Sequence, residues 1–218
     1  MAAANTSPNV AKPSGLSPYR NGDGSNWNGA ANIYYANSND AAYMAIGDLV
    51  YINGTSDAQG IPGCTKAAGA TTVSRGVVVG WLPTGPGGGV SLVGSALALE
   101  NPRPAISTTR YLLVVDDPNV VFKAQLDNGT NPGSAALSTL LTMNASQNTP
   151  TYNNYQATTS VSAASIAVTA GLSLKLMGLV VGPENANVDV TAGNGQYAWV
   201  QCRINMHDLG VIGGQVGI

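Results

Sequence analysis

Residues 111–125 read Tyr-Leu-Leu-Val-Val-Asp-Asp-Pro-Asn-Val-Val-Phe-Lys-Ala-Gln, two apolar runs on either side of an Asp-Asp-Pro turn. Val and other β-branched residues favour the pleated surface of a strand. Pro118 interrupts the run because proline has no N–H to donate to a β-ladder, and Asp-Pro pairs favour turns. The stretch therefore predicts two strands joined by a turn, in a scaffold built from β-structure.

The composition describes a chain with a core but very little charge. Of the 218 residues, 44% are apolar and 9% are charged, whereas about 25% charged residues is usual in soluble domains. The length fits one all-β domain, since such domains commonly run to ~200–250 residues. Gly, Ala, Ser, Thr and Asn fill the polar positions, so we expect a neutral, amide-rich surface.

Charge and hydropathy exclude several classes of partner. A net charge of −2 and a pI near 5.1 leave no basic tract able to neutralise many phosphates, so we expect no nucleic-acid binding. The start of the chain lacks the pattern of a signal peptide, and no stretch reaches ~18 consecutive apolar residues. We expect a soluble, non-exported chain that makes no membrane contact.

Turn signals divide the chain into an extended N-terminal arm, residues 1–45, and a β domain, residues 46–218. The arm has three prolines and four glycines and no sustained periodicity. The β domain alternates short apolar runs with turns, which predicts a single antiparallel sandwich or barrel, jelly-roll-like, of about eight strands. Leucine spacing predicts one short helix over Ala135–Met143.

The eight expected strands share a β-rich run closed by a turn signal. They are Asp48–Asn53, Val73–Leu82, Val90–Leu99, Arg110–Val115, Val120–Leu126, Val161–Thr169, Leu172–Val181 and Tyr197–Met206.

Aromatic residues stand out in the polar arm and are the candidates for contact with a partner. Tyr19, Trp27, Tyr34 and Tyr35, with Arg20 beside the first of them, are of the types enriched at protein interfaces. The alternative, that these rings pack back onto their own domain, is equally open at the level of sequence.

Residues with catalytic chemistry are sparse. His207 is the sole histidine, and in a strand Cys202 would point to the opposite face from it. Asp116 and Asp117 are adjacent and precede a proline, which favours a turn over a pair of catalytic carboxylates. We expect no enzymatic activity, no cofactor and no metal site.

Two further features have simple interpretations. Cys64 and Cys202 are far apart without Cys-x-x-Cys spacing, so we expect buried free thiols in place of a disulfide or zinc site. Residues 21–26, Asn-Gly-Asp-Gly-Ser-Asn, only partly match a calcium loop and are expected to form an ordinary loop.

Four segments together resemble a known group of proteins. Residues 114–125 resemble a "DDP-x-V-x-F-x-x-Q" pattern of tailed-bacteriophage head proteins, and residues 15–22 resemble their "GL-x-P-x-R" opening. Residues 178–186 and 199–207 are similar to their closing strands and follow in the expected order. The resemblance is to the capsid decoration, or cement, protein family.

This resemblance implies a non-enzymatic virion protein on the outer capsid surface. Its partners would be the major capsid protein and further copies of itself, commonly in a homotrimer. The alternative function is a phage tail-associated or receptor-binding module whose Asn, Tyr and Trp residues contact host glycans. A glycan-processing enzyme would need separated acidic residues in one groove, and the acidic residues here lie mostly in turn-like contexts.

Overall fold

The computed structural model describes residues 9–67, 72–82, 109–127, 142–146, 160–167, 171–186, 188–191 and 193–210. Within these ranges the chain is all-β, with mostly antiparallel pairing and one short 3₁₀ helix, which confirms the expected sandwich or barrel class. The elements are β1 Ser17–Asn21, β2 Asn32–Ala36, β3 Leu49–Ser56, β4 Pro62–Lys66, β5 Gly76–Leu82, β6 Arg110–Val115, β7 Val120–Gln125, β8 Thr142–Ser146, β9 Ser160–Ala167, β10 Leu174–Leu179, η1 Pro183–Asn185 and β11 Trp199–Ile204.

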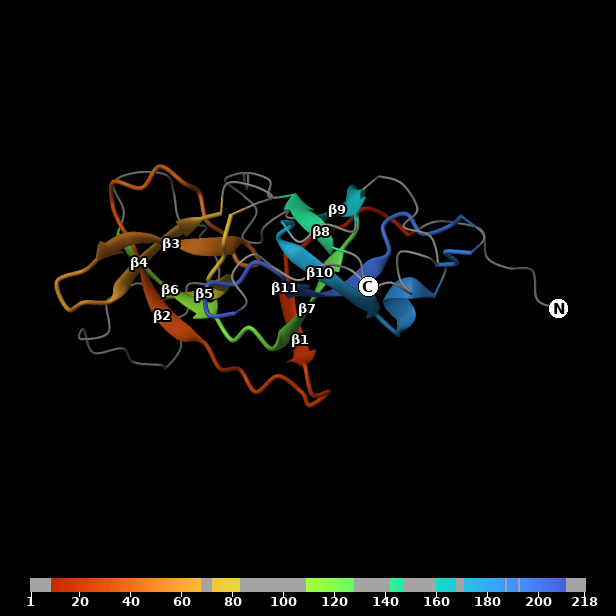
Figure 1. Cartoon of the computed structure of the whole chain (residues 1–218), viewed down its shortest axis with the longest axis horizontal. Helices are drawn as coiled ribbons and strands as arrows, with labels where there is room; N and C mark the ends of the chain where they lie inside the picture. The colour runs from red at the N-terminus through yellow and green to blue at the C-terminus, as the bar shows by residue number, and fades with distance from the viewer. Residues whose placement is uncertain are drawn as a thin grey trace.

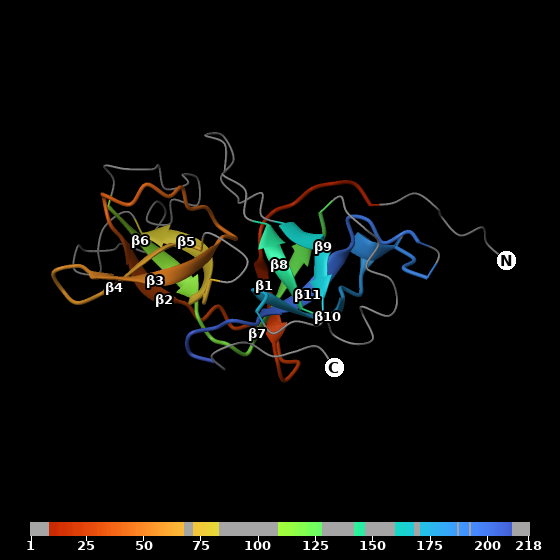
Figure 2. The same ribbon diagram turned by 45° about the horizontal axis from the view of Figure 1, so that its top comes forward.

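The strands form two layers that lie side by side in Figure 1. One is a closed barrel with the order β2-β4-β3-β5-β6, and the other is a six-stranded sheet with the order β1-β7-β11-β10-β8-β9. The chain crosses from the barrel to the sheet at the turn between β6 and β7 (Figure 2). The sheet also curls, because Leu126, just after β7, bridges Val161 of β9.

Strands β5 and β6 of the barrel bury side chains on both of their faces, which explains the uninterrupted apolar runs in their sequences. Val78 of β5 and Val114 of β6 point into the barrel core, whereas their neighbours Val77 and Val115 join the core shared with the sheet. Strands covered on both sides read as continuous hydrophobic runs and not as an alternating pattern. The apolar run before the Asp-Asp-Pro turn therefore reflects its position between two cores.

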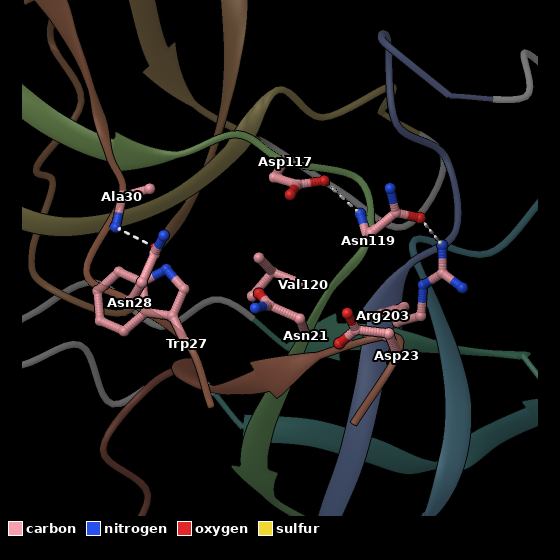
Figure 3. Close-up of a pocket in the computed structure, with 10 residues that line it drawn as sticks. Asn21, Asp23, Trp27, Asn28, Ala30, Asp117, Asn119, Val120 and Arg203 are labelled. Carbon is pink, nitrogen blue, oxygen red and sulfur yellow. Dashed lines mark hydrogen bonds between the residues drawn. The ribbon is translucent and has the colours of Figure 1, made fainter. Parts of the chain in front are cut away.

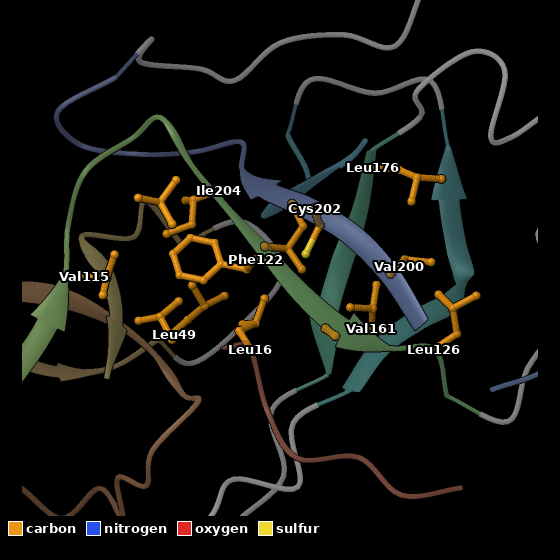
Figure 4. Close-up of a cluster of buried hydrophobic side chains, with 14 of the residues drawn as sticks. Leu16, Leu49, Val115, Phe122, Leu126, Val161, Leu176, Val200, Cys202 and Ile204 are labelled. Carbon is orange, nitrogen blue, oxygen red and sulfur yellow. The ribbon is translucent and has the colours of Figure 1, made fainter. Parts of the chain in front are cut away.

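The shared core joins barrel and sheet into one packed unit. Figure 4 shows Phe122 of β7 between Leu49 and Val115 from the barrel and Cys202 and Ile204 from β11. Phe122 is fully buried. Burial of an aromatic side chain between two layers stabilises their contact by the hydrophobic effect and by close packing.

Seven of the eight expected strands are present, although their ends differ by a few residues. The eighth, Val90–Leu99, lies outside the described residues. Strands β1, β2, β4 and β8, all of them five residues long, were not predicted. Of the helix expected over Ala135–Met143, residues 142 and 143 belong to β8, and the rest lies outside the described residues.

The expectation of an extended arm over residues 1–45 is wrong for its central part. β1 pairs antiparallel with β7, and β2 pairs with β6 across all five of its residues. Leu16 is buried in the shared core. The prolines and glycines that suggested an arm sit between and within short strands, so the folded unit begins well before residue 46.

Gly15 and Gly47 fasten the chain before β1 to the barrel. Both have positive φ, and a Cβ on Gly15 would lie 2.7 Å from the Cα of Gly47. The N–H of Leu16 donates to the carbonyl of Gly47 at 3.0 Å. Only glycine fits such a close approach of two backbones without strain.

Cys64 and Cys202 are both buried, as expected, and neither forms a disulfide within the described residues. No helix in the described ranges has the length and apolar character needed to cross a membrane.

Candidate docking face and adjoining pockets

Four adjacent strands, β1, β7, β11 and β10, present one polar face of the six-stranded sheet. On β11, Val200 and Cys202 point into the shared core, so Gln201 and Arg203 point outward, because side chains alternate along a strand. Cross-strand pairing places Lys123 opposite Gln201 and Lys175 opposite Arg203.

Arg20 of β1 joins this face through two hydrogen bonds. Its Nε and Nη2 donate to Oε1 of Gln201 at 3.1 and 2.9 Å. We call the set Arg20, Lys123, Lys175, Gln201 and Arg203 the basic face. It gathers four of the nine basic residues of a chain whose net charge is −2.

Neutral acceptors hold the two arginines of the basic face. Arg20 bonds Gln201, and Arg203 Nη2 donates to the carbonyl of Pro118 at 2.9 Å. Lys123 is the exception, since its Nζ lies 3.4 Å from Oε1 of Glu184 and above the ring of Trp199. The arginine charges are therefore fixed in place without being neutralised by the groups that hold them.

Residues 9–12 cover one end of the face. The N–H of Lys12 donates to Oε1 of Gln125 at 2.6 Å, and Nε2 of Gln125 donates to the carbonyl of Val10 at 2.9 Å. Asn9 Nδ2 donates to the carbonyl of Glu184 at 2.8 Å. The segment before β1 is thus bound along this edge of the sheet.

The first pocket adjoins the other end of the face and has a volume of about 490 Å³. Figure 3 shows that it is built from the turn after β1, the segment Trp27–Ala30, the turn before β7, and Arg203 from β11. Asp23 accepts from the N–H of Ser25 at 2.9 Å, and Asp117 accepts from the N–H of Asn119 at 2.8 Å.

The carboxylates of Asp23 and Asp117 therefore stabilise turns by accepting backbone hydrogen bonds, as the sequence predicts for Asp117 and for the loop 21–26. Hydrogen bonds from Ser25 lower the pKa of Asp23, so its carboxylate is charged at neutral pH. Trp27 lies in the pocket wall and also packs against the shared core.

The second pocket shares Asn119 and Arg203 with the first and has a volume of about 240 Å³. Pro118, Asn119, Lys175, Arg203, Ile204, Asn205, His207 and Gly210 line it. None of these described residues is acidic.

His207 in its wall is buried, and its Nδ1 accepts from the N–H of Leu209 at 3.1 Å. The contact of Nδ1 with Oδ1 of Asp208 is longer, at 3.4 Å. We therefore take Nδ1 as the acceptor in the neutral ring, which places the proton on Nε2. Burial lowers the pKa of His207, and Asp208 partly opposes that shift.

The structure separates the five residues predicted to contact a partner. Arg20 belongs to the basic face, Trp27 lines the first pocket, and Tyr19 on β1 is 37% exposed. Tyr35 is on the barrel, where its ring packs against Tyr111 with centroids 5.8 Å apart.

Tyr34 is buried inside the barrel, so its prediction as a contact residue is wrong. Its hydroxyl donates to Oδ2 of Asp116 at 2.6 Å, and Asn32 donates to both oxygens of the same carboxylate. Burial and this hydrogen bond raise the pKa of Tyr34. The alternation along β2 turns Tyr34 inward, and Asp116 is the buried acceptor that satisfies its hydroxyl.

Lys175, Gln201, Arg203 and the wall position of His207 were not predicted from the sequence. The alternation in Trp199-Val-Gln-Cys-Arg-Ile could have indicated one outward polar face, but the partners on β7 and β10 depend on strand register. Sequence spacing alone does not give that register.

Groups suited to catalysis or metal binding do not converge among the described residues. No cluster of three or more His, Cys, Asp or Glu side chains able to hold a metal ion is found there. Burial raises the pKa of the Cys202 thiol to about 12, so it is not a thiolate at neutral pH. The arrangement offers fixed hydrogen-bonding and charged groups for binding.

Comparisons with protein-family models, with curated proteins and with solved structures found no match for this chain.

Proposed function

We propose that the chain is a non-enzymatic virion protein that binds the outside of a tailed-phage capsid and stabilises the shell. The observation that carries this proposal is the arrangement of the four segments with the decoration-protein resemblance. They contribute β1, β7, β11 and the end of β10, which are consecutive neighbours in one sheet.

Residues of these segments also bind one another. Arg20 of the opening motif bonds Gln201 of the closing strand, and Arg203 bonds the carbonyl of Pro118 in the Asp-Asp-Pro turn. Phe122 and Leu16 share the core beneath them. Four short patterns that are far apart in sequence thus describe one structural unit, which favours a common origin for them over chance.

The basic face supplies a surface for docking on a shell. Its cations are held on rigid strands, so little side-chain entropy is lost when a partner binds. A homotrimer would present three such faces, and linked sites raise the overall affinity even when each contact is weak. The major capsid protein and further copies of this chain are the proposed partners, on the outer capsid surface of the virion.

Decoration can be tested with purified protein and heads of the encoding phage that lack it. We expect the protein to co-sediment with the heads, and image averaging should place it at symmetric positions outside the shell. Heads carrying it should resist heat or chelation better than bare heads. Failure to bind heads, or localisation to the tail, would reject the proposal.

The first pocket favours a second candidate, a receptor- or glycan-binding module. Trp27 lines this pocket together with Asn21, Asp23 and Asp117. Aromatic and polar side chains in one pocket can bind hydroxyl-rich ligands. A glycan array and localisation on the virion separate the two functions. Specific glycan binding that is lost in Trp27→Ala, by a protein placed at the tail, would favour this second candidate.

A further inference from the structure

Three features of the second pocket together indicate a negatively charged ligand. Lys175 and Arg203 lie directly opposite each other on β10 and β11, and both line the pocket. Like charges in directly opposed positions destabilise a sheet. An anion bound between the two side chains would offset this repulsion.

His207 gives an independent indication. Its side chain is 2% exposed, and Nε2 has no hydrogen-bond partner among the described residues. Because Nδ1 accepts from the N–H of Leu209, Nε2 of the neutral ring carries the proton and is a donor without an acceptor. Buried donors are normally satisfied, so this one calls for an acceptor at or near the pocket wall.

The remaining wall adds amide groups. Asn119 and Asn205 line the pocket, and Asn119 Oδ1 is 3.4 Å from Nη2 of Arg203. Arg203 already uses Nε and Nη2 toward the Pro118 carbonyl, at 3.3 and 2.9 Å, and this contact fixes the plane of its guanidinium. A guanidinium held in this way can present its remaining N–H groups to a ligand without losing further rotamer freedom.

We propose that this pocket binds an oxyanion, through Lys175 and Arg203 with His207 in its wall. The ligand is either a free phosphate-type ion or a carboxylate from a partner chain. These share the planar or tetrahedral oxygen groups that arginine and lysine bind through charge-assisted hydrogen bonds. The volume of about 240 Å³ suits a group of that size and not an extended polymer.

The sole histidine provides a direct probe, since its imidazole resonances need no assignment among several. The isolated protein would be titrated with inorganic phosphate and, separately, with glutarate, at constant ionic strength and pH. We expect a saturable shift of the His207 resonances. Saturation by glutarate shows that the pocket accepts a carboxylate of the kind that a partner chain would supply, and saturation by phosphate alone favours a free phosphate-type ion.

Two variants remove the charges of the pocket, and a third serves as a matched control. Lys175→Met and Arg203→Gln should each weaken binding about tenfold, equivalent to about 1.4 kcal/mol. Lys12→Met removes an exposed cation that belongs neither to the pocket nor to the basic face, and should leave the dissociation constant unchanged. Thermal melting of each variant verifies that it is folded.

Absence of a saturable shift with both probes would overturn the proposal, as would equal weakening in Lys12→Met. The test uses isolated protein without capsids, so its result is independent of whether the chain decorates heads. If the protein failed to bind heads, saturable oxyanion binding would still support the proposed pocket.

Discussion

The barrel and the six-stranded sheet differ in where their charged groups lie and in what those groups contact. In the barrel, Asp48 is fully buried and lies 3.0 Å from Nζ of Lys66, and Asp116 accepts hydrogen bonds from Tyr34 and Asn32. These two carboxylates therefore have partners within the barrel region. The sheet instead gathers cations of one sign on its outer face, held mainly by neutral groups.

This difference distinguishes charged groups that maintain the structure from charged groups that are available for binding. A buried ion pair that satisfies both partners maintains the structure around it, and removal of one partner is costly. Cations on a sheet surface contribute little to stability, so their accumulation is better explained by a ligand. We therefore assign a structural role to the barrel and the shared core, and we propose a binding role for the basic face.

The largest expected effect concerns the core that joins the two regions. Phe122→Ala should lower the free energy of unfolding by about 3–5 kcal/mol, because it leaves a cavity between barrel and sheet. Urea denaturation followed by fluorescence and by circular dichroism should give one coincident transition. Val181→Ala, at an 88% exposed position, is the control and should change little. Two separate transitions in the wild-type protein would mean that barrel and sheet unfold independently.

Gly15→Ala should be the next most damaging change, because it tests whether the chain before β1 belongs to the folded body. The new methyl would collide with Gly47 and would also occupy a positive φ, which costs about 1–2 kcal/mol by itself. Gly29 has a similar φ of +85°, and a methyl added there would have no atom within 4 Å, so Gly29→Ala isolates the conformational cost. Equal melting temperatures for the two variants would contradict the close packing of Gly15.

The two adjacent aspartates of the β6–β7 turn should differ in their contribution to the free energy of unfolding, although their sequence context is the same. Asp116→Ala leaves the buried hydroxyl of Tyr34 without its acceptor and should cost about 1–3 kcal/mol. Asp117 is exposed and accepts only from the N–H of Asn119, so Asp117→Ala should cost less than about 1 kcal/mol. Chemical denaturation of both variants measures this, and a reversed order would refute the assignment.

The smallest effect is a pH dependence from His207. Its folded-state pKa lies below the ordinary value of 6.5, because burial outweighs the opposing effects of Asp208, Asp116 and Asp117, and Arg75 acts in the same direction as burial. The unfolded chain then binds the proton more tightly, so stability is retained above pH 6.5 and falls as the pH decreases below it. His207→Gln should flatten this dependence. An unchanged pH profile in the variant would assign the dependence to other groups.

The sequence predicts the strands whose runs are long and apolar. β6 is predictable because it buries side chains on both faces, which gives an uninterrupted apolar run. β7 is predictable because its apolar run follows directly after the Asp-Asp-Pro turn in residues 111–125. β1 and β4 contain Pro18 and Pro62, which argue against a strand in sequence although an edge position or a strand's first residue tolerates proline. β2 is missed for another reason. It is only five residues long, and its tyrosines in a polar segment suggest contact with a partner and not burial in a strand.

The binding face is less predictable for a different reason. Lys175 and Arg203 are neighbours only through the register of β10 on β11, and Arg20 reaches Gln201 from a strand at the start of the chain. No local pattern encodes these pairings. Composition even argues against a basic surface, because the average charge of the chain conceals the gathering of cations on one sheet.

Charge reversal distinguishes docking through the basic face from docking through the barrel. Occupancy on undecorated heads would be measured for Arg203→Glu and for the double variant Ala58→Glu with Gln59→Glu. Each changes the net charge by two negative units, and the second does so at the exposed turn between β3 and β4. We predict that Arg203→Glu weakens binding to heads by about tenfold or more, equivalent to at least about 1.4 kcal/mol, while the turn variant binds as the wild type does. Full occupancy by Arg203→Glu, with loss of binding in the turn variant, would contradict docking through the basic face and place the contact on the barrel.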